Sequence, residues 1–324
     1  MNTFGHNFRL AIWGESHGPE VGVAIDGVPA GLPLAPEDFA GDLARRRAGA
    51  AGTTQRREED LPQIVSGLYR GRTTGAPLTI RFANADVRSG DYAELAEHCR
   101  PSHADFAVRC KSAGRNDPRG GGHTSARLTA ALVAAGVVAT RCLGPEVLFA
   151  TRLVSVGGEE DPARFDAAVA EAAAAGDSTG GVVECRVTGI RPGAGEPFFD
   201  SVESLVAHLL FSVPAVKGVE FGAGFAGARM RGSEYNDRIL DAAGRTATNH
   251  DGGINGGMTN GNEILFRAAF KPTPSIAREQ LTYHFGEQRL LPLRIRGRHD
   301  ACVALRGAVV AEAAAAIALA DLMR

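Results

Sequence analysis

The alternation of apolar and polar positions along the chain predicts both helices and short strands. Helical spacing together with helix start signals predicts five helices, at 36–47, 124–143, 161–175, 200–212 and 307–323. Short alternating runs between them predict strands at 21–25, 78–82, 182–187 and 264–269. At the fourth helix, Asp200 as N-cap with Glu203 three residues later resembles a capping box. We therefore expect a mixed helix and strand protein.

The two halves of the chain resemble each other. A shift of 162 residues brings eight residues onto identical partners within 30 positions, among them Gly27 onto Gly189 and Asp38 onto Asp200. Chance at ~7% per position would give about two. We expect one domain, 1–324, with an internal duplication at about 1–162 and 163–324. In this alignment His17 is paired with Thr179, and the arginines at 45–47 are paired with different residues. A fold shared by both halves does not need these first-half residues, so they are candidates for chemistry.

Charge and composition exclude several classes of protein. The chain has 35 Lys plus Arg and 37 Asp plus Glu, a net charge of −2, which argues against a nucleic-acid partner. A hydrophobic content of 44% argues against disorder. No signal peptide precedes the first charged residues, and the apolar runs predict no membrane span. Five scattered cysteines favour reduced thiols over disulfides or a metal site, so we expect a cytoplasmic protein.

Two histidines stand in segments suited to proton transfer. His17 lies between glycines in the segment 14–18, where a turn would allow close approach to a ligand, and its ordinary pKa of ~6.5 suits chemistry near neutral pH. In the segment 100–105, His103 and Asp105 share a face if the chain is extended, so that Asp105 would orient the imidazole. For both histidines a purely structural hydrogen bond is the alternative.

Other segments are suited to binding anions. Arg45, Arg46 and Arg47 end the first predicted helix, either as a solvated helix end or as a clasp for an anionic ligand. Three glycines at 120–122 open onto the second helix and favour a phosphate site, although the motif is neither a P-loop nor a dinucleotide fingerprint. Glycines at 252–261 would lie against a flat ligand. Lys271 to Ser275 and the segment 297–300 complete the series.

Taken in this order, these segments resemble chorismate synthase, nearly from end to end of the chain. The resemblance implies the anti 1,4-elimination of phosphate from 5-enolpyruvylshikimate 3-phosphate to give chorismate, a reaction of the shikimate pathway that requires reduced FMN. It implies an α+β fold in which helices pack between two antiparallel sheets, and a homotetramer. Such a sandwich agrees with two copies of one unit.

The resemblance also implies residue roles. The catalytic residues would be His17 near the leaving phosphate, His103 near the flavin, and Asp300 managing a flavin proton. The substrate would be bound by Arg45, Arg46, Arg47, Arg100, Arg127 and Arg298. FMN contacts carry over onto His123, Thr124, Ser125, Pro214, Ala215, Gly256, Lys271, Pro272, Thr273, Pro274, Ser275 and Arg298.

Two departures from the family pattern bear on the cofactors. His123 stands where the family commonly has Arg, which makes FMN affinity dependent on pH. Arg46 is a candidate NADP contact, but the loop lacks the extra Arg that the family places near Gly52, and this weakens the assignment of NADPH as reductant. An external flavin reductase is the other source of reduced flavin. A non-catalytic FMN-binding module and an ordinary flavin oxidoreductase remain alternatives.

Overall fold

Two antiparallel sheets form the framework of the protein. The computed structural model describes residues 2–49, 52–54, 56, 58–86, 94–295 and 299–323. The first sheet has the strand order β1-β2-β3-β7-β4, with bounds Thr3–Phe4, Arg9–Gly14, Glu20–Asp26, Leu78–Ala83 and Gln63–Ser66. The second has the order β10-β13-β9-β8, with bounds Val216–Phe221, Ile264–Phe270, Gly181–Thr188 and Leu148–Val156. All pairs within both sheets are antiparallel, so the predicted mixed architecture is confirmed.

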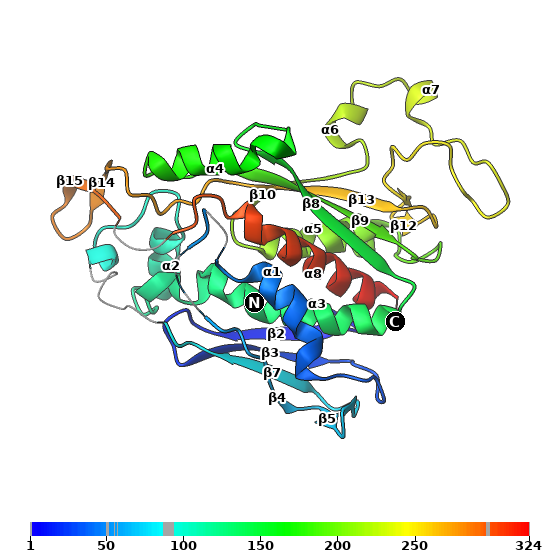
Figure 1. The fold of residues 1–324 in the computed structure, drawn as a ribbon, viewed down its shortest axis with the longest axis horizontal. Coiled ribbons are helices and arrows are strands. Elements are labelled where there is room, and N and C mark those ends of the chain that lie inside the picture. The colour runs from blue at the N-terminus through cyan, green and yellow to red at the C-terminus, as the bar shows by residue number, and fades with distance from the viewer. Residues whose placement is uncertain are drawn as a thin grey trace.

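Four helices lie between these sheets in Figure 1, namely α1 (Ala40–Arg46), α3 (Thr129–Leu143), α5 (Val202–Ser212) and α8 (Ala304–Leu322). α3 packs on the first sheet and α8 on the second, and the two helices contact each other along their length. α4 (Phe165–Ala174) lies on the outer side of the second sheet (Figure 1). Shorter helices are α2 (Asp105–Ser112), α6 (Gly224–Gly227) and α7 (Gly232–Tyr235).

Three two-stranded hairpins complete the described chain. They pair β5 (Leu68–Tyr69) with β6 (Arg72–Thr73), β11 (Ile254–Asn255) with β12 (Met258–Thr259), and β14 (Gln280–His284) with β15 (Arg289–Leu293). The five predicted helices correspond to α1, α3, α4, α5 and α8, and the four predicted strands to β3, β7, β9 and β13. The predicted cap of α5 was wrong by one residue, because Ser201 rather than Asp200 accepts a bond from the backbone N–H of Ser204, at 3.0 Å.

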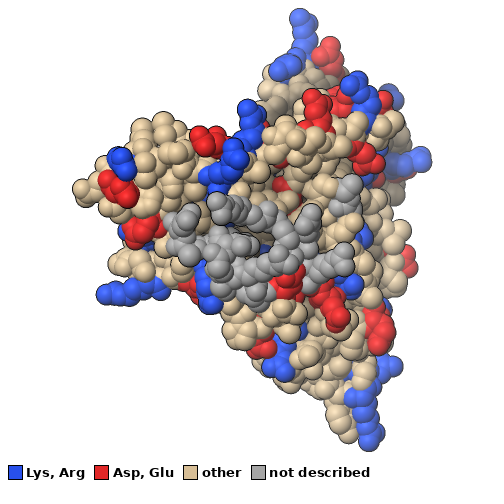
Figure 2. Space-filling view, turned by 60° about the vertical axis from the view of Figure 1, so that its left-hand side comes forward, with Lys and Arg blue, Asp and Glu red and all other residues tan. Residues whose placement is uncertain are grey.

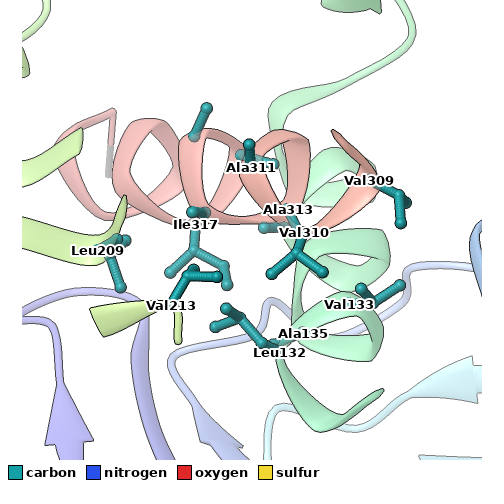
Figure 3. Packing of buried hydrophobic residues seen from close by; sticks show 14 of the residues in the cluster. Leu132, Val133, Ala135, Leu209, Val213, Val309, Val310, Ala311, Ala313 and Ile317 are labelled. Carbon is teal, nitrogen blue, oxygen red and sulfur yellow. The ribbon is translucent and has the colours of Figure 1, made fainter. Parts of the chain in front are cut away.

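The core is unusually rich in alanine where α3 meets α8. A side chain at Gly136 would place its Cβ 2.4 Å from the Cβ of Ala313, so only glycine allows this close approach. Branched side chains fill the remaining space, with Leu132 and Val133 of α3 facing Val310 of α8 (Figure 3). Small residues at the crossing therefore bring the helices, and the sheets that they cover, close together.

The helical run 126–143 is long and apolar enough to cross a membrane by length and composition. However, 72% of that segment is buried inside the protein, as expected for a core helix. Near the other end of the chain, the buried carboxylate of Asp321 in α8 accepts bonds from the backbone N–H groups of His6, Asn7 and Phe8, at 2.9, 2.6 and 2.7 Å. The last helix thus holds the segment that joins β1 to β2.

Candidate active site

A cavity of about 800 Å³ opens between the first sheet, the start of α3 and the end of α5. Its apolar wall includes Phe4, Ile12 and Leu132, and its polar wall carries guanidinium, imidazole and hydroxyl groups. Figure 2 shows acidic and basic side chains interspersed over the described part of one face of the molecule, in keeping with the near-neutral net charge. The cationic character of the cavity thus comes from arginines in its walls. A cavity of this size, with one apolar wall and one polar wall, is typical of a small-molecule site.

His17 stands at the centre of a tight turn after β2. The N–H of Gly18 donates to the carbonyl of Glu15 at 3.1 Å, and the N–H of Ser16 donates to the carbonyl of Gly122 at 3.1 Å. The side chain of His17 is buried and is not in the described lining of the cavity, whereas its neighbour Ser16 is. Burial lowers the pKa of His17, and the nearby charges of Arg56 and Arg119 lower it further.

The glycine loop at 120–122 packs directly on both predicted catalytic histidines. All three glycines have positive φ, at 59°, 83° and 53°. A Cβ at Gly120 would lie 2.4 Å from the ring of His17, and one at Gly121 would lie 3.2 Å from the ring of His103. The loop therefore lets the backbone approach both imidazoles, and it brings them to neighbouring positions from segments far apart in the sequence.

His103 is held by an acid and an arginine. Its Nδ1 lies 2.6 Å from the carboxylate of Asp105, and Arg100 binds the same carboxylate with bonds of 2.7 and 2.8 Å. Burial raises the pKa of Asp105, but Arg100 and His103 outweigh it and hold the pKa below its usual range. The predicted contact between His103 and Asp105 is therefore present. The predicted extended segment is not, since Asp105 begins α2 and the residues before it form a turn.

Arg46 and Arg127 are bound to one buried carboxylate beneath the cavity. Asp60 accepts a bond of 2.8 Å from Arg46 and a second bond from Arg127. Arg46 also donates to Thr129 and to two backbone carbonyls, so four of its N–H groups have partners. Burial lowers the pKa of Arg46 to about 9, with Arg306 acting in the same direction. Both guanidinium groups are bound to Asp60 and serve mainly to shape the cavity wall.

Asp300 lines the cavity and is fixed by two donors. The backbone N–H of Thr54 donates to its carboxylate at 2.9 Å, and Arg306 of α8 donates to both oxygens at 3.2 and 3.1 Å. The carbonyl of Gly52 accepts a bond of 2.7 Å from Ala301. These bonds attach the loop that follows α1 to the start of α8, at the edge of the cavity.

Most of the other predicted site residues also line this cavity. They are Arg47, Arg100, His123, Thr124, Ser125, Pro214, Ala215, Lys271, Thr273, Pro274 and Ser275. Arg45 does not, because its guanidinium pairs with Glu312 and Asp42 at the surface. Gly256, in the turn between β11 and β12, and Pro272 are also absent from the described lining. Arg298 lies outside the described residues.

Among the lining residues that were not predicted as site residues, three carry basic side chains close to predicted ones. Arg56 donates to the hydroxyl and the carbonyl of Ser16, at 2.9 and 3.0 Å, and so lies beside the His17 turn. His208 of α5 packs on Phe4 with ring centroids 5.4 Å apart. Arg306 holds Asp300. Arg56 follows the arginines at 45–47 by about ten positions, and His208 lies within a predicted helix that gave no signal of a site. Arg306 directly precedes the last predicted helix, which gave no such signal either.

The family model for chorismate synthase matches residues 8–323. The chain belongs to the chorismate synthase family. It is 57% identical over 324 residues to a chorismate synthase of Chitinophaga pinensis, covering all of this chain and 96% of that protein. It is 44% identical to one of Korarchaeum cryptofilum, covering 99% of this chain and 96% of that protein. A solved structure of chorismate synthase superposes with a TM-score of 0.76 at 27% identity, covering 99% of this chain and 92% of the other. The family consists of carbon–oxygen lyases.

Proposed function

We propose that this cavity binds 5-enolpyruvylshikimate 3-phosphate beside reduced FMN, and that the chain eliminates phosphate from this substrate to give chorismate. The observation that carries the proposal is that His103 and several arginine side chains line one cavity, and that the loop at 120–122 packs on both His103 and His17 beside it. A substrate with a phosphate and two carboxylates needs several charge-assisted bonds once it leaves water. Arg47 is suited to supply them, because it lines the cavity and its buried Nε has no hydrogen-bond partner among the described residues.

The donor set of the cavity also fits FMN. Thr273 lines the cavity, and its buried hydroxyl has no hydrogen-bond partner among the described residues. Thr124, Ser125 and Ser275 lie around the same space. Lys271 donates to the carbonyl of Ser102 at 2.5 Å and joins this wall to the His103 segment. When bound, reduced FMN lends electron density to the substrate as the C–O bond breaks, and recovers it afterwards.

His17 is placed to protonate or stabilise the leaving phosphate. In the free protein its lowered pKa makes the imidazole neutral near pH 7. A phosphate dianion would add negative charge beside it and raise the pKa again, so substrate binding would bring a proton to His17. Arg56, next to Ser16, would hold the phosphate in place. The charge that develops on the leaving group would then be neutralised at the site where it forms.

His103 and Asp300 are the groups that we assign to the flavin side of the cavity. Asp105 and Arg100 fix the ring of His103, and its other nitrogen would face the cofactor. Asp300, held by Thr54 and Arg306, would accept or return a proton. His123 lines the same cavity in place of the usual Arg, and its Nδ1 lies 2.7 Å from the carbonyl of Gly14. We infer that His123 contacts the flavin from this wall of the cavity.

We further propose that the fold is a sandwich of two copies of one unit. The four strands of the first unit are β2, β3, β4 and β7, and they lie in the order β2-β3-β7-β4. The four strands of the second unit are β8, β9, β10 and β13, and they lie in the equivalent order β8-β9-β13-β10. Gly27 and Gly189 end equivalent strands with φ of 85° and 82°, and a Cβ at either would lie 1.9 Å from a carbonyl oxygen. A helix follows the second strand in both copies, as α1 and α5, and another follows the fourth, as α3 and α8.

The remaining assignments concern the oligomeric state, the localisation and the source of reduced flavin. We propose a homotetramer in the cytoplasm that receives reduced flavin either from its own NADPH-dependent reduction or from an external flavin reductase. NADPH would approach Arg46, whose N–H groups are largely committed to Asp60, Thr129 and backbone carbonyls. This favours the external reductant. Anaerobic turnover with NADPH plus FMN, compared with chemically reduced FMN, distinguishes the two.

The central test is an anaerobic incubation of the protein with reduced FMN and 5-enolpyruvylshikimate 3-phosphate. We expect phosphate and chorismate to be released in equal amounts. Tight flavin binding without turnover would identify a binding module, and steady NADPH consumption coupled to another acceptor would identify an oxidoreductase. Either result would refute the proposal. Replacing His17 by Ala should lower kcat far more than it weakens substrate binding.

A further inference from the structure

The side chain of Asn84 bridges the turn that carries His17. Asn84 follows β7, and its amide nitrogen donates to the carbonyl of Glu15 at 3.0 Å and to the carbonyl of Gly18 at 2.8 Å. These two carbonyls belong to the first and last residues of the turn, with Ser16 and His17 between them. The backbone N–H of Asn84 donates to Pro19 at 3.0 Å. Asn84 thus binds the turn at Glu15 and Gly18, on either side of His17, and also binds Pro19, which follows the turn.

Asn84 is itself held from the opposite side by Arg127. The Nε of Arg127 donates to the amide oxygen of Asn84 at 2.8 Å, and its other nitrogens bind Asp60 and the carbonyl of Ala83. Both donors of the Asn84 amide and its oxygen therefore have partners, which fixes the direction of the amide. A buried carboxylate, a guanidinium and an amide form a continuous chain of bonds that ends on the His17 turn.

We infer that Asn84 is a positioning residue for the elimination, acting through His17. This inference rests on the role proposed for His17. Both amide donors of Asn84 are bound to the turn and its amide oxygen to Arg127, so its side chain has no donor left for the substrate. Only an amide can donate twice to the turn and accept from Arg127 with the same short side chain. An aspartate of the same shape would set a carboxylate oxygen against two carbonyls. Its attraction to Arg127 would draw it away from the turn.

The consequence for catalysis follows from geometry. His17 must meet a leaving oxygen at hydrogen-bond distance, and a displacement of about 1 Å in such a group can cost on the order of 100-fold in rate. We expect Asn84→Asp and Asn84→Ala to lower kcat by about 10- to 100-fold and to change KM less than about threefold. Substrate contacts made by the arginines of the cavity would persist, which is why the loss falls on kcat.

Asn262→Asp is the matched control. Asn262 is also half-buried and donates twice, to Gly244 and to Asn260, both at 3.0 Å. It lies in the loop after β12, away from the described lining of the cavity. We expect its replacement to leave kcat within about twofold. Thermal unfolding of all variants separates loss of folded protein from loss of rate, and Asn84→Ala decides the question if Asn84→Asp does not fold.

A double-variant comparison tests the coupling. If Asn84 acts through His17, then His17→Ala combined with Asn84→Ala is no slower than His17→Ala alone. Multiplied effects, or an Asn84→Ala enzyme with unchanged kcat, would overturn the inference.

A readout without turnover comes from NMR titration of the His17 imidazole with inorganic phosphate. In Asn84→Ala the phosphate-induced shift of the His17 pKa should shrink, and an unchanged shift would contradict a positioning role. If His17→Ala alone keeps full kcat, the proposed role of His17 fails, and the NMR result still decides whether Asn84 positions the ring.

Discussion

Replacing Asp60 by Asn tests how the cationic wall of the cavity is stabilised. Asp60 is 4% exposed and is the shared carboxylate partner of two buried guanidinium groups, Arg46 and Arg127. Asparagine keeps the shape and one acceptor oxygen, but its amide N–H₂ would face a guanidinium donor. One buried positive charge would then lack a counterion. Breaking a buried ion pair in this way costs about 3–5 kcal/mol.

The expected size of the effect can be expressed as a melting temperature. At ~2.1 cal/mol/K per residue, unfolding 324 residues carries an entropy of about 0.7 kcal/mol/K. A loss of about 3–5 kcal/mol therefore lowers Tm by roughly 4–7 °C, which calorimetry at pH 7 resolves. Asp26→Asn is the control, because Asp26 pairs with Arg9 at 2.5 Å at the surface, where such a pair is worth about 1 kcal/mol or less.

The pH dependence of the same variant gives an independent check. Burial raises the pKa of Asp60, but Arg46 and Arg127 outweigh it and hold the pKa below its usual value. Stability from this carboxylate is therefore present above the unfolded pKa of ~3.9 and is lost as pH falls through the lower folded pKa. The difference between the parent protein and Asp60→Asn should shrink in acid. Equal Tm for Asp60→Asn and Asp26→Asn at pH 7, or a difference that does not depend on pH, would refute the reasoning.

Three further outcomes are expected. Inorganic phosphate should raise the pKa of His17 in an NMR titration, because it opposes the effects of burial and of the neighbouring guanidinium groups; a constant pKa would show that phosphate does not bind beside it. Arg47→Ala should raise KM for the substrate by about 10- to 100-fold, whereas Arg45→Ala, at the surface, should change steady-state constants by less than about twofold; equal effects would contradict the placement of the two side chains. Exposed Cys110 should react with a thiol reagent at pH 8, while Cys185, whose pKa burial raises to about 12, should react only on unfolding; fast reaction of Cys185 would contradict its burial.

Hydrophobic spacing predicted five helices and four strands, and missed α2 and the strands β2, β8 and β10 of the two sheets. α3 and α8 are apolar along most of their length, and α1, α4 and α5 begin with clear start signals. α2 is only eight residues long, is polar on average and has no fully buried residue, so the sequence analysis did not identify it. The cap of α5 was misplaced because Asp200 and Ser201 are both good N-cap residues, and only the fold determines which side chain meets the first free N–H groups.

The site was predicted as a set of segments, but not as a set of contacts. Arg45, Arg46 and Arg47 were treated as one group, although successive helical residues point about 100° apart. In the structure Arg45 points to the surface, Arg46 to Asp60 and Arg47 to the cavity. The bonds that organise the site join residues such as Arg127 and Asp60, 67 positions apart. No local pattern in the sequence records such pairings.

The contact between Asp321 and the segment 6–8 determines when the first sheet can be completed. Every strand of that sheet is made before residue 84, yet the backbone N–H groups of His6, Asn7 and Phe8 find their carboxylate only in α8. Synthesis delivers the N-terminus first, at about 5–20 residues per second. The link between β1 and β2 can therefore gain these three bonds only after α8 has been made. In this protein α8 both fills the core and binds the segment that joins β1 to β2. A chain that ends before residue 321 would lack the carboxylate that holds residues 6–8 in place.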